Sequence, residues 1–280
     1  MKVSAIVFSK NRALQLDLLL KSIYSNFKEC MEVDIIYKET EEHKDSYEKL
    51  KSEHQMKLAA PFVYFHKQGD NNFYQLIYNL VSEARTSHVV FFTDDDIVYR
   101  NVNIPDIALE SILHTNFSCL SLRLGGNITK RQIGDFMYDE MIPNFSVSNN
   151  ILIWDYTECN PCGYFGYPMS VDGHIFCKKK LLDILDKMDT RGQLETPNKF
   201  EELLVGFATD TGRYMISLSE SCVVNSPNNR VQEEYKNRAG DHYSYCEDHL
   251  MNLYLVGTRI DLKSLDFSNV NCPHTEIKII

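Results

Sequence analysis

The chain has 280 residues, of which 44% are hydrophobic, and it carries a formal net charge of -10. This composition supports a large folded core and excludes a disordered or fibrous protein. The negative charge argues against broad electrostatic attraction to nucleic acid or to anionic lipid. We therefore expect no nucleic-acid partner, and we expect any phosphate binding to be local.

The opening segment MKVSAIVFSKNR lacks the length and cleavage pattern of a signal peptide, and no apolar stretch reaches the roughly 20 residues of a membrane span. The eight cysteines are most simply reduced thiols. These features predict a cytoplasmic protein with no membrane span, with peripheral attachment to the inner face of the membrane as a second option. Cys159 and Cys162 have ligand-like spacing, but the absence of a second such pair favours an ordinary loop over a zinc site.

The first hundred residues alternate apolar runs of strand length with segments in which apolar residues recur at helical spacing. This rhythm predicts an α/β fold, with a mostly parallel sheet and helices on both faces. Ligands in such sheets bind beyond the carboxyl ends of the strands, so the residues after the first and fourth strands are of most interest. The predicted strands are 3–8, 33–37, 61–65 and 88–93, and the predicted helices are 14–27, 41–57 and 72–85.

After residue 101 the pattern becomes mixed, without a linker or an internal repeat, which favours a single domain. A polar passage rich in Gly and Met runs to about residue 148. Strands are predicted at 116–122, 150–156, 170–178 and, as one or two strands, 214–224; helices are predicted at 105–114, 178–188 and 199–207.

The most specific feature is VVFFTDDDIVY, in which a buried strand delivers Asp94, Asp95 and Asp96 to the ligand-binding edge of the sheet. Adjacent carboxylates repel one another, so the cluster favours a divalent cation such as Mn²⁺ or Mg²⁺. If the chain stays extended, Asp94 and Asp96 face alike and Asp95 points elsewhere. The alternative is an acidic surface turn.

A second feature is the loop SKNR directly after the first strand. It lacks the Gly-rich phosphate-binding patterns and offers side chains instead. Arg12 is suited to clamp a pyrophosphate, Asn11 suits a tight backbone conformation and a hydrogen bond to a base, and Ser9 opens the loop. A helix N-terminus follows and attracts anions. An ordinary exposed loop has the same composition.

Together, the FSKNR loop before a Leu-rich helix and the strand ending FTDDDIVY resemble the GT-A glycosyltransferases. The segments YPMSVDGHIF, PNKFE and NNRVQ with NRAG resemble a bacterial family-2-like group of nucleotide-sugar transferases. The resemblance implies one continuous GT-A domain, with a donor half at 1–100 and an acceptor half at 101–280 that ends in a closing segment. It also implies a nucleotide-diphosphate sugar donor, first a UDP-sugar, a divalent metal, and a glycan or lipid-linked acceptor in surface polysaccharide synthesis.

The resemblance also implies roles for single residues. The donor would be bound by Ser9, Asn11, Arg12, Tyr37 (with the wall 37–39 beside the base), Asp94 and Asp95. The metal would be held by Asp96 and Asp94, with a late histidine, His274 or less favourably His242, as a third ligand. Three basic residues would cover the diphosphate when the C-terminal loop closes: Arg230, Lys236 and Arg238.

An inverting transferase needs a carboxylate base beside the acceptor hydroxyl. The candidates are Asp172, which lies before Gly173, and Glu201, which the resemblance favours over its neighbour Glu202. Either of these two residues is our catalytic prediction. Gly173 would permit close approach of a sugar.

Two further segments of the acceptor half have a functional and a structural interpretation. An aromatic acceptor platform or core packing would explain Trp154, Tyr164, Phe165 and Tyr167 beside Asp155. Attraction of a phosphorylated or lipid-linked acceptor, or simple solvation, would explain Lys178, Lys179 and Lys180.

Three other functions share some of these features. A sugar-nucleotide pyrophosphorylase should have a Gly-rich turn after the first strand, and SKNRALQ has no glycine. A non-catalytic carbohydrate or nucleotide-binding module would have little reason to keep three adjacent carboxylates. A metal-dependent hydrolase differs from a transferase in whether the site excludes water, which the sequence does not reveal.

Overall fold

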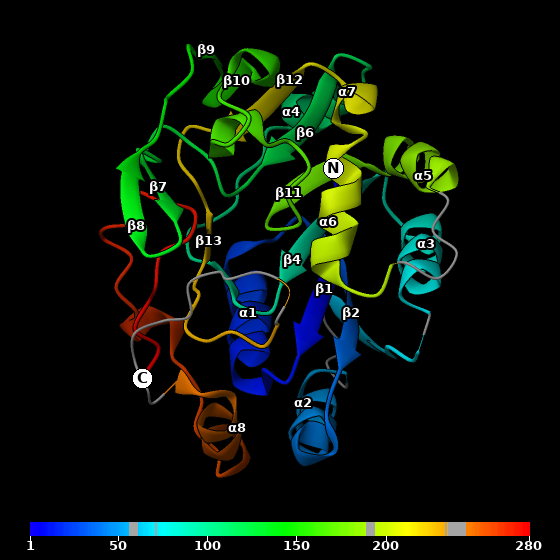
Figure 1. Cartoon of the computed structure of the whole chain (residues 1–280), viewed down its shortest axis with the longest axis vertical. Coiled ribbons are helices and arrows are strands. Elements are labelled where there is room, and N and C mark those ends of the chain that lie inside the picture. Colours follow the sequence, from blue (N-terminus) through cyan, green and yellow to red (C-terminus); the bar gives the residue numbers. More distant parts are fainter. Residues whose placement is uncertain (56–60, 71, 189–193, 233, 235–244) are drawn as a thin grey trace.

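The structure, a computed structural model, describes residues 1–55, 61–70, 72–188, 194–232, 234 and 245–280 (Figure 1). At its centre lies a nine-stranded sheet in which β11 and β10 run opposite to the other seven strands. The sheet is therefore mixed and mostly parallel, as predicted. In spatial order its strands are β3 (Phe62–Lys67), β2 (Cys30–Lys38), β1 (Val3–Lys10), β4 (His88–Thr93), β11 (His174–Cys177), β6 (Phe117–Ser121), β12 (Tyr214–Leu218), β10 (Ile151–Asp155) and β9 (Ser146–Ser148).

The first strand shows why the sequence has continuous apolar runs. Alternate side chains of β1 enter the two hydrophobic cores that lie on opposite faces of the sheet: Val7 belongs to one core and Phe8 to the other. A strand covered on both faces needs no polar side. β1 pairs in parallel with both β2 and β4, so the three strands end side by side at one edge of the sheet.

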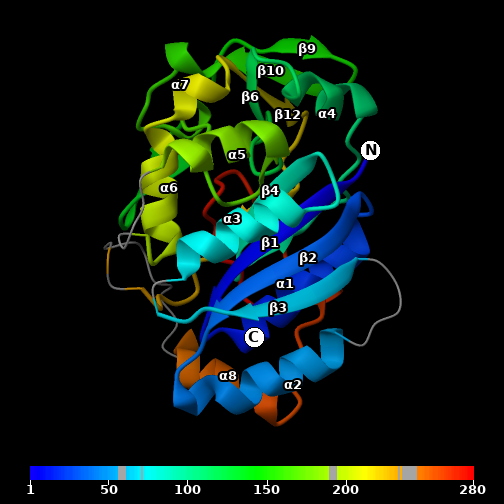
Figure 2. The same cartoon turned by 90° about the vertical axis from the view of Figure 1, so that its right-hand side faces the viewer.

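Helices cover both faces (Figure 2). The helix that follows β1 is buried along nearly its whole first three turns, which matches its apolar sequence. One core includes residues of α1 (Ala13–Asn26), α2 (Lys44–His54), α4 (Asp106–Ile112) and α8 (Glu247–Leu255). The other core includes residues of α3 (Phe73–Glu83), α5 (Lys178–Lys187) and α6 (Pro197–Val205).

Two small sheets and several short helices complete the described chain. Strand β5 (Asp96–Val98) pairs with β13 (Val223–Asn225), and β7 (Lys130–Ile133) forms a hairpin with β8 (Phe136–Asp139). The short helices are α7 (Ala208–Thr211), η1 (Glu41–His43), η2 (Tyr156–Glu158), η3 (Tyr164–Gly166) and η5 (Leu262–Ser264).

Several elements differ from the prediction, and three differences are the most informative. The polar passage before residue 148 contains the β7–β8 hairpin, whose strands lack strict alternation. The strand predicted at 170–178 is shorter, because 170–173 form a loop and Gly173 has a φ of +72° that breaks the extended chain. Helix α8 had no predicted counterpart. In the described residues no helix combines the length and the apolar character that crossing a membrane requires.

Candidate functional site

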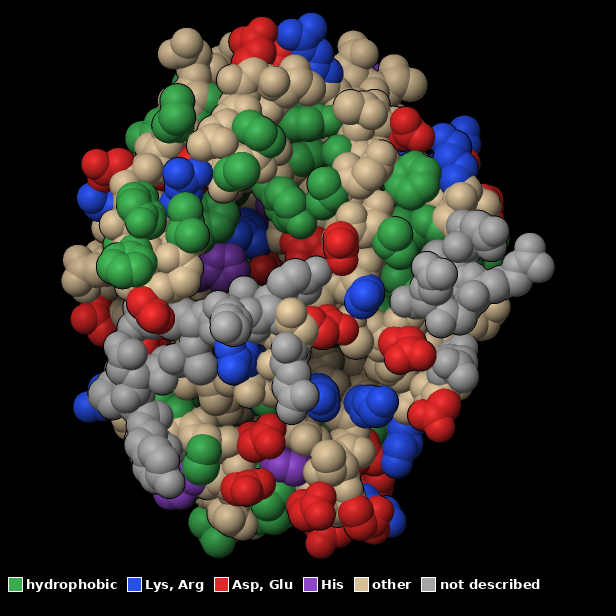
Figure 3. Space-filling view, in the orientation of Figure 1, with side chains coloured by type: hydrophobic (Ala, Val, Ile, Leu, Met, Phe, Trp, Pro, Cys, Tyr) green, Lys and Arg blue, Asp and Glu red, His purple; other side chains and the backbone are tan. Residues whose placement is uncertain are grey.

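A cleft of about 840 Å³ lies beyond the carboxyl ends of β1, β2 and β4. We call these strand ends, residues 8–12, 36–38 and 93–95, the strand wall. Residues 161–172 and the start of α6 (196–201) form the opposite side, which we call the loop wall. Residues of the segment 225–232, together with Glu234 and His274, also line the cleft. The space-filling view shows the hollow near the middle of the molecule, with charged and histidine side chains at its base (Figure 3).

On the strand wall, Arg12 neutralises the aspartates that follow β4. One guanidinium nitrogen lies 2.9 Å from Asp94 Oδ1 and 2.8 Å from Asp95 Oδ2. The other two nitrogens donate to the side chain and the backbone carbonyl of Asn229. Burial lowers the pKa of Arg12, but the two carboxylates outweigh it and keep the pKa above its ordinary value. The cation that the cluster requires is thus at least partly supplied by the protein.

This position corrects the predicted role of Arg12. Its nitrogens point to Asp94, Asp95 and Asn229, so a clamp on the pyrophosphate would require it to break these bonds. A buried ion pair with additional hydrogen bonds is costly to break on one side only. Arg12 therefore organises the strand wall, and among the described residues Lys10, Lys38 and Arg230 are further basic side chains that line the cleft.

Asp94 is fixed by the end of β1 as well as by Arg12. Its Oδ2 accepts hydrogen bonds from the Ser9 hydroxyl and the Lys10 backbone amide, both at 2.9 Å. Burial raises the pKa of Asp94 to about 6, with Asp95 adding to the effect and Arg12 opposing it. Ser9 and Asp94, both predicted donor-binding residues, lie together at the cleft.

Asp96 lies behind the cleft rather than in it. The chain turns at 94–95, so Asp94 and Asp95 line the cleft and Asp96 points into the protein. Its carboxylate accepts from the Thr93 backbone amide at 2.9 Å and from the Asn225 amide at 3.2 Å, and the residue is fully buried. The chain is thus not extended at 94–95, so Asp94 and Asp96 do not face alike, and Asp95 rather than Asp96 lines the cleft.

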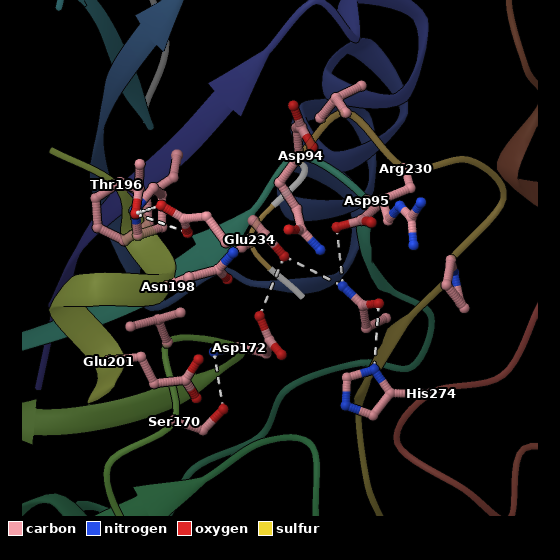
Figure 4. Close-up of a pocket in the computed structure, with 18 of the residues that line it drawn as sticks. Asp94, Asp95, Ser170, Asp172, Thr196, Asn198, Glu201, Arg230, Glu234 and His274 are labelled. Carbon is pink, nitrogen blue, oxygen red and sulfur yellow. Dashed lines mark hydrogen bonds between the residues drawn. The ribbon is translucent and has the colours of Figure 1, made fainter. Parts of the chain in front are cut away.

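Asn225 joins this cluster to His274. Its amide nitrogen donates to Asp95 at 2.9 Å, and its amide oxygen lies 3.3 Å from His274 Nδ1 (Figure 4). His274 Nε2 lies 3.1 Å from Arg123, which can only donate, so Nε2 accepts and Nδ1 carries the proton. Burial and the charge of Arg123 lower the pKa of His274 to about 3. The imidazole is therefore neutral.

Arg123 holds the loop wall in place. It follows β6 and donates to the Ser170 hydroxyl at 2.6 Å and to the Asp172 carboxylate at 2.9 Å. Its guanidinium also lies over the ring of Tyr164, 5.2 Å from the centroid. Asp172 accepts a second bond from Thr93, which links the two walls. Burial raises the pKa of Asp172, and Arg123 opposes the shift.

Glu201 lies on the loop wall in the first turn of α6. The helix begins with Pro197 after Thr196, whose hydroxyl accepts from the Lys199 amide. Burial, and next the charge of Asp172, raise the pKa of Glu201 to about 7. Figure 4 shows the Glu201 and Asp172 side chains on one side of the cleft, with Asp94 and Asp95 beyond them. Both predicted base candidates thus lie in the cleft.

Two predicted donor contacts point away from the cleft. Asn11 adopts the predicted tight conformation, with φ of +56°, but its side chain accepts from the Thr40 amide at 3.0 Å and does not line the cleft. Tyr37 is buried and stacks on Tyr47 with ring centroids 5.1 Å apart. Because side chains alternate along β2, Ile36 and Lys38 face the cleft instead.

The aromatic platform is only partly correct. Trp154 is 2% exposed and donates to the Phe165 carbonyl, and both residues pack in a hydrophobic core. Tyr164 and Tyr167 do line the cleft. Asp155 pairs with Arg213 away from it.

Two of the three lysines at the start of α5, Lys178 and Lys180, have structural roles. Lys178 donates to the Ala84 carbonyl, and Lys180 donates to the carbonyls of His114, Phe117 and Thr211. These bonds tie α5 to neighbouring loops, so an acceptor-binding role for this run is not supported. Gly173, next to Asp172, faces the side chain of Val223 rather than the cleft.

Other predicted ligands are accounted for as follows. Cys159 and Cys162 are free cysteines, Cys159 partly buried and Cys162 exposed. His242, Lys236 and Arg238 lie outside the described residues.

In the described part of the chain, one group of three residues has possible metal-ligand atoms within 4.8 Å of one another: Asp17, Glu53 and His54. Lys21 and Arg259 pair with its carboxylates, which identifies it as a buried ion-pair network between α1 and α2 rather than a metal centre.

Two residues of the site, Arg123 and Asn225, were missed by sequence reasoning. Each stands directly after or at the end of an apolar run, in CLSLRLGG and in CVVNSP. The rule that directed attention to the ends of the first and fourth strands applies equally to these strands. It was not extended to them because the mixed second half gave no prediction of strand direction.

Comparison with solved structures identifies the fold. No protein-family model matches the sequence, and no curated protein matches it either. The chain superposes on residues 1–349 of Staphylococcus aureus TarS with a TM-score of 0.52 and 16% identity, covering 81% of this chain and 61% of that one. The complex of the same TarS fragment with UDP-GlcNAc superposes with a TM-score of 0.51 and 15% identity, covering 94% of this chain and 69% of that one. The fold is of the GT-A glycosyltransferase type.

This GT-A fold confirms the predicted fold class. At 15–16% identity the likeness shows the fold alone. In the first of these superpositions, the chain spans less than two thirds of the TarS fragment. The cleft of this chain combines acidic groups at the strand ends, basic side chains along its lining, and a carboxylate of raised pKa on the facing wall.

Proposed function

We propose that the chain is a glycosyltransferase that moves a sugar from a nucleotide-diphosphate sugar to an acceptor hydroxyl. The observation that carries the proposal is the pairing of two walls across one cleft. The strand wall presents Asp94 and Asp95, and the loop wall presents Glu201, whose pKa is raised to about 7. A perturbed carboxylate in a cleft is typical of acid–base catalysis. The GT-A fold and the UDP-GlcNAc complex of TarS make a UDP-sugar the first donor to test.

We assign the nucleotide diphosphate to the strand wall. In sheets with parallel neighbours, ligands bind beyond the carboxyl strand ends, where β1, β2 and β4 meet. Lys10, Lys38 and Arg230 line this part of the cleft and carry the positive charge that a diphosphate needs. Asp94, held by Ser9 and Arg12, has a fixed position from which to accept hydrogen bonds from ribose or sugar hydroxyls.

Asp95 and His274 are the residues that would hold a divalent cation, since a carboxylate and an imidazole are suitable ligands. Asp95 is the aspartate of the cluster that lines the cleft next to Asn225, and the neutral imidazole of His274 is the form that binds metals. His274 Nε2 now accepts from Arg123, so ligation through that nitrogen would require Arg123 to shift. When bound, Mn²⁺ or Mg²⁺ would supply positive charge to the diphosphate leaving group.

We assign the acceptor and the base to the loop wall. Asp172 is already ion-paired with Arg123 through one carboxylate oxygen and accepts from Thr93 with the other, so both of its oxygens have partners. Glu201 is the better base, because a pKa of about 7 suits proton transfer at neutral pH. Its carboxylate would take the acceptor hydroxyl proton as the oxygen bonds to the anomeric carbon. The bond from that carbon to the diphosphate breaks, and the nucleoside diphosphate leaves.

The test measures donor binding and turnover in the same preparation. Thermal unfolding is followed with UDP-, GDP-, CMP- and dTDP-sugars, each with Mn²⁺ and with EDTA, because ligands that bind the folded state raise its apparent stability. We expect one UDP-sugar to stabilise the wild type with Mn²⁺ and much less with EDTA. Asp95→Asn should remove that difference. If no sugar nucleotide stabilises the chain, the proposed function is wrong; release of free sugar without transfer would identify a hydrolase.

A further inference from the structure

Large hydrophobic side chains are exposed on one part of the molecule in particular. Scattered single apolar residues are common on protein surfaces, whereas a group of them marks a binding surface. Among the described residues, the segment 133–147 contains the densest run of exposed large hydrophobics. Its members, which we call the hairpin patch, are Ile133, Phe136, Met137, Tyr138, Met141, Ile142 and Val147.

The hairpin that carries most of this patch has no core of its own. All four residues of β8 are exposed, and a lone two-stranded ribbon is marginally stable in water. Polar contacts tie it to the loop wall: Arg131 donates to the Cys162 carbonyl, and Glu140 accepts from the Tyr164 amide. The protein thus holds an apolar ribbon in place without covering it.

The patch is continuous with the cleft. Gln132 and Gly134, in the same hairpin, line the cleft with Pro161 and Tyr164 of the loop wall. In Figure 3, hydrophobic side chains extend from the β7–β8 region at the left to the upper rim of the central hollow. A ligand seated at the loop wall can therefore extend onto the patch without leaving the protein surface.

The side of the cleft that the patch adjoins identifies its occupant. A nucleotide-diphosphate sugar is polar or charged along its length, and its proposed site is the strand wall. The acceptor is the reactant at the loop wall, and its aglycone is the part that can be apolar. A second protein copy seated on the patch would cover the rim through which the acceptor enters.

We infer that the acceptor carries an alkyl or isoprenoid aglycone, which lies along the hairpin patch while the acceptor hydroxyl reaches Glu201. The inference rests on the proposed function and names its acceptor class. Burying a few methylene groups against apolar side chains strengthens binding by about tenfold or more. The patch would thereby select lipid-linked acceptors over free sugars.

The experiment uses dodecyl maltoside, below the concentration at which it forms micelles, and maltose as the matched probe without the chain. Calorimetry in the presence of UDP should show dodecyl maltoside binding at least about tenfold more tightly than maltose. The double variant Phe136→Ser, Met141→Ser should lose that preference. A control with equally polar changes at exposed sites elsewhere, Ile107→Ser with Val256→Ser, should keep it.

Three outcomes would overturn the inference. These are equal affinity for the two probes, preference retained in the hairpin variant, and an oligomer in sedimentation that the hairpin variant dissociates, which would assign the patch to a second copy. UDP-sugar binding is measured on the same samples. If the donor binds and the dodecyl preference is absent, the acceptor class is wrong and the proposed function stands; if no donor binds, the proposed function itself fails.

Discussion

The strand wall and the loop wall hold their carboxylates in different ways. On the strand wall, Asp94 and Asp95 share one buried arginine and several hydrogen bonds from neighbouring strand ends. On the loop wall, Glu201 stands in the first turn of a helix with its pKa raised to about 7. The first arrangement fixes the positions of two carboxylates through many partners, and the second raises the pKa of one carboxyl to a value suited to proton transfer near neutral pH. A single cleft thus combines a densely hydrogen-bonded acidic wall with one that carries a candidate proton acceptor.

The largest effect that tests this difference is expected on the loop wall. Glu201→Gln removes the proposed base, and general-base assistance is typically worth about a hundredfold to ten-thousandfold in rate. Turnover of a UDP-sugar should fall on that scale, while calorimetric donor affinity stays unchanged. Glu202→Gln, an exposed neighbour on the same helix, is the matched control and should retain activity. Near-normal turnover in Glu201→Gln would transfer the role to Asp172 or exclude an inverting mechanism.

On the strand wall the largest effect should be on stability. Arg12→Ala leaves the buried Asp94 and Asp95 without their countercharge, and breaking a buried pair in this way costs about 3–5 kcal/mol. Urea unfolding should show this loss in the free energy of unfolding. Lys10→Ala, at the exposed end of β1, should change it by less than about 0.5 kcal/mol. Equal stability of the two variants would show that Arg12 is not the organising cation.

The rate should depend on pH through Glu201. A base acts in its ionised form, so with a pKa of about 7 the turnover number should rise with pH and level off above 7. At pH 6 it should be roughly a tenth of the plateau. The free energy of unfolding should change in the opposite direction. A carboxyl whose pKa is higher in the folded than in the unfolded state binds more protons when folded, so its contribution to stability is lost as the pH rises from about 4.5 to 7. A rate profile that is flat from pH 5 to 8 would contradict Glu201 as the base.

The smallest expected effect concerns the loop that positions Arg12. Asn11 has a φ of +56°, which costs alanine about 1 kcal/mol and costs glycine little. Asn11→Ala should therefore be less stable than Asn11→Gly by about that amount, although both lose the bond to the Thr40 amide. Thermal unfolding of the two variants makes the comparison. Equal melting temperatures would show that the tight loop relaxes at no cost.

The sequence was most informative where one rule determined the outcome. Continuous apolar runs separated by helical patterns correctly predicted β1 to β4 and the edge at which the cleft lies, because strands buried on both faces leave that signature. The resemblance to the GT-A family added Glu201, and the strand-to-glycine turn added Asp172, and both residues line the cleft. The sequence did not predict the side-chain directions of Asp96, Tyr37 and Asn11, which do not line the cleft. These directions depend on a turn, or on which residue begins the alternation of a strand, and neither can be read from the sequence.

The remaining errors arose from partners distant in the sequence. Arg12 was read as a ligand-binding residue because its pairing with Asp94 and Asp95, some eighty residues away, has no local signature. For Trp154, the sequence could not distinguish core packing from an acceptor platform, because its contact with Phe165 joins residues eleven positions apart in different elements. Arg123 and Asn225 acquire their roles only through contacts that cross the sheet.

The reversed strand β11 has a consequence for how the chain folds during synthesis. It lies between β4 and β6 and pairs with both, although β4 ends at residue 93 and β11 begins at residue 174. Until the ribosome has released residue 177, β4 has an unpaired edge of apolar residues, which is a template for aggregation. The sheet edge at β4 therefore cannot be completed before residues 174–177 have emerged, and a nascent chain paused near residue 100 would depend on chaperones.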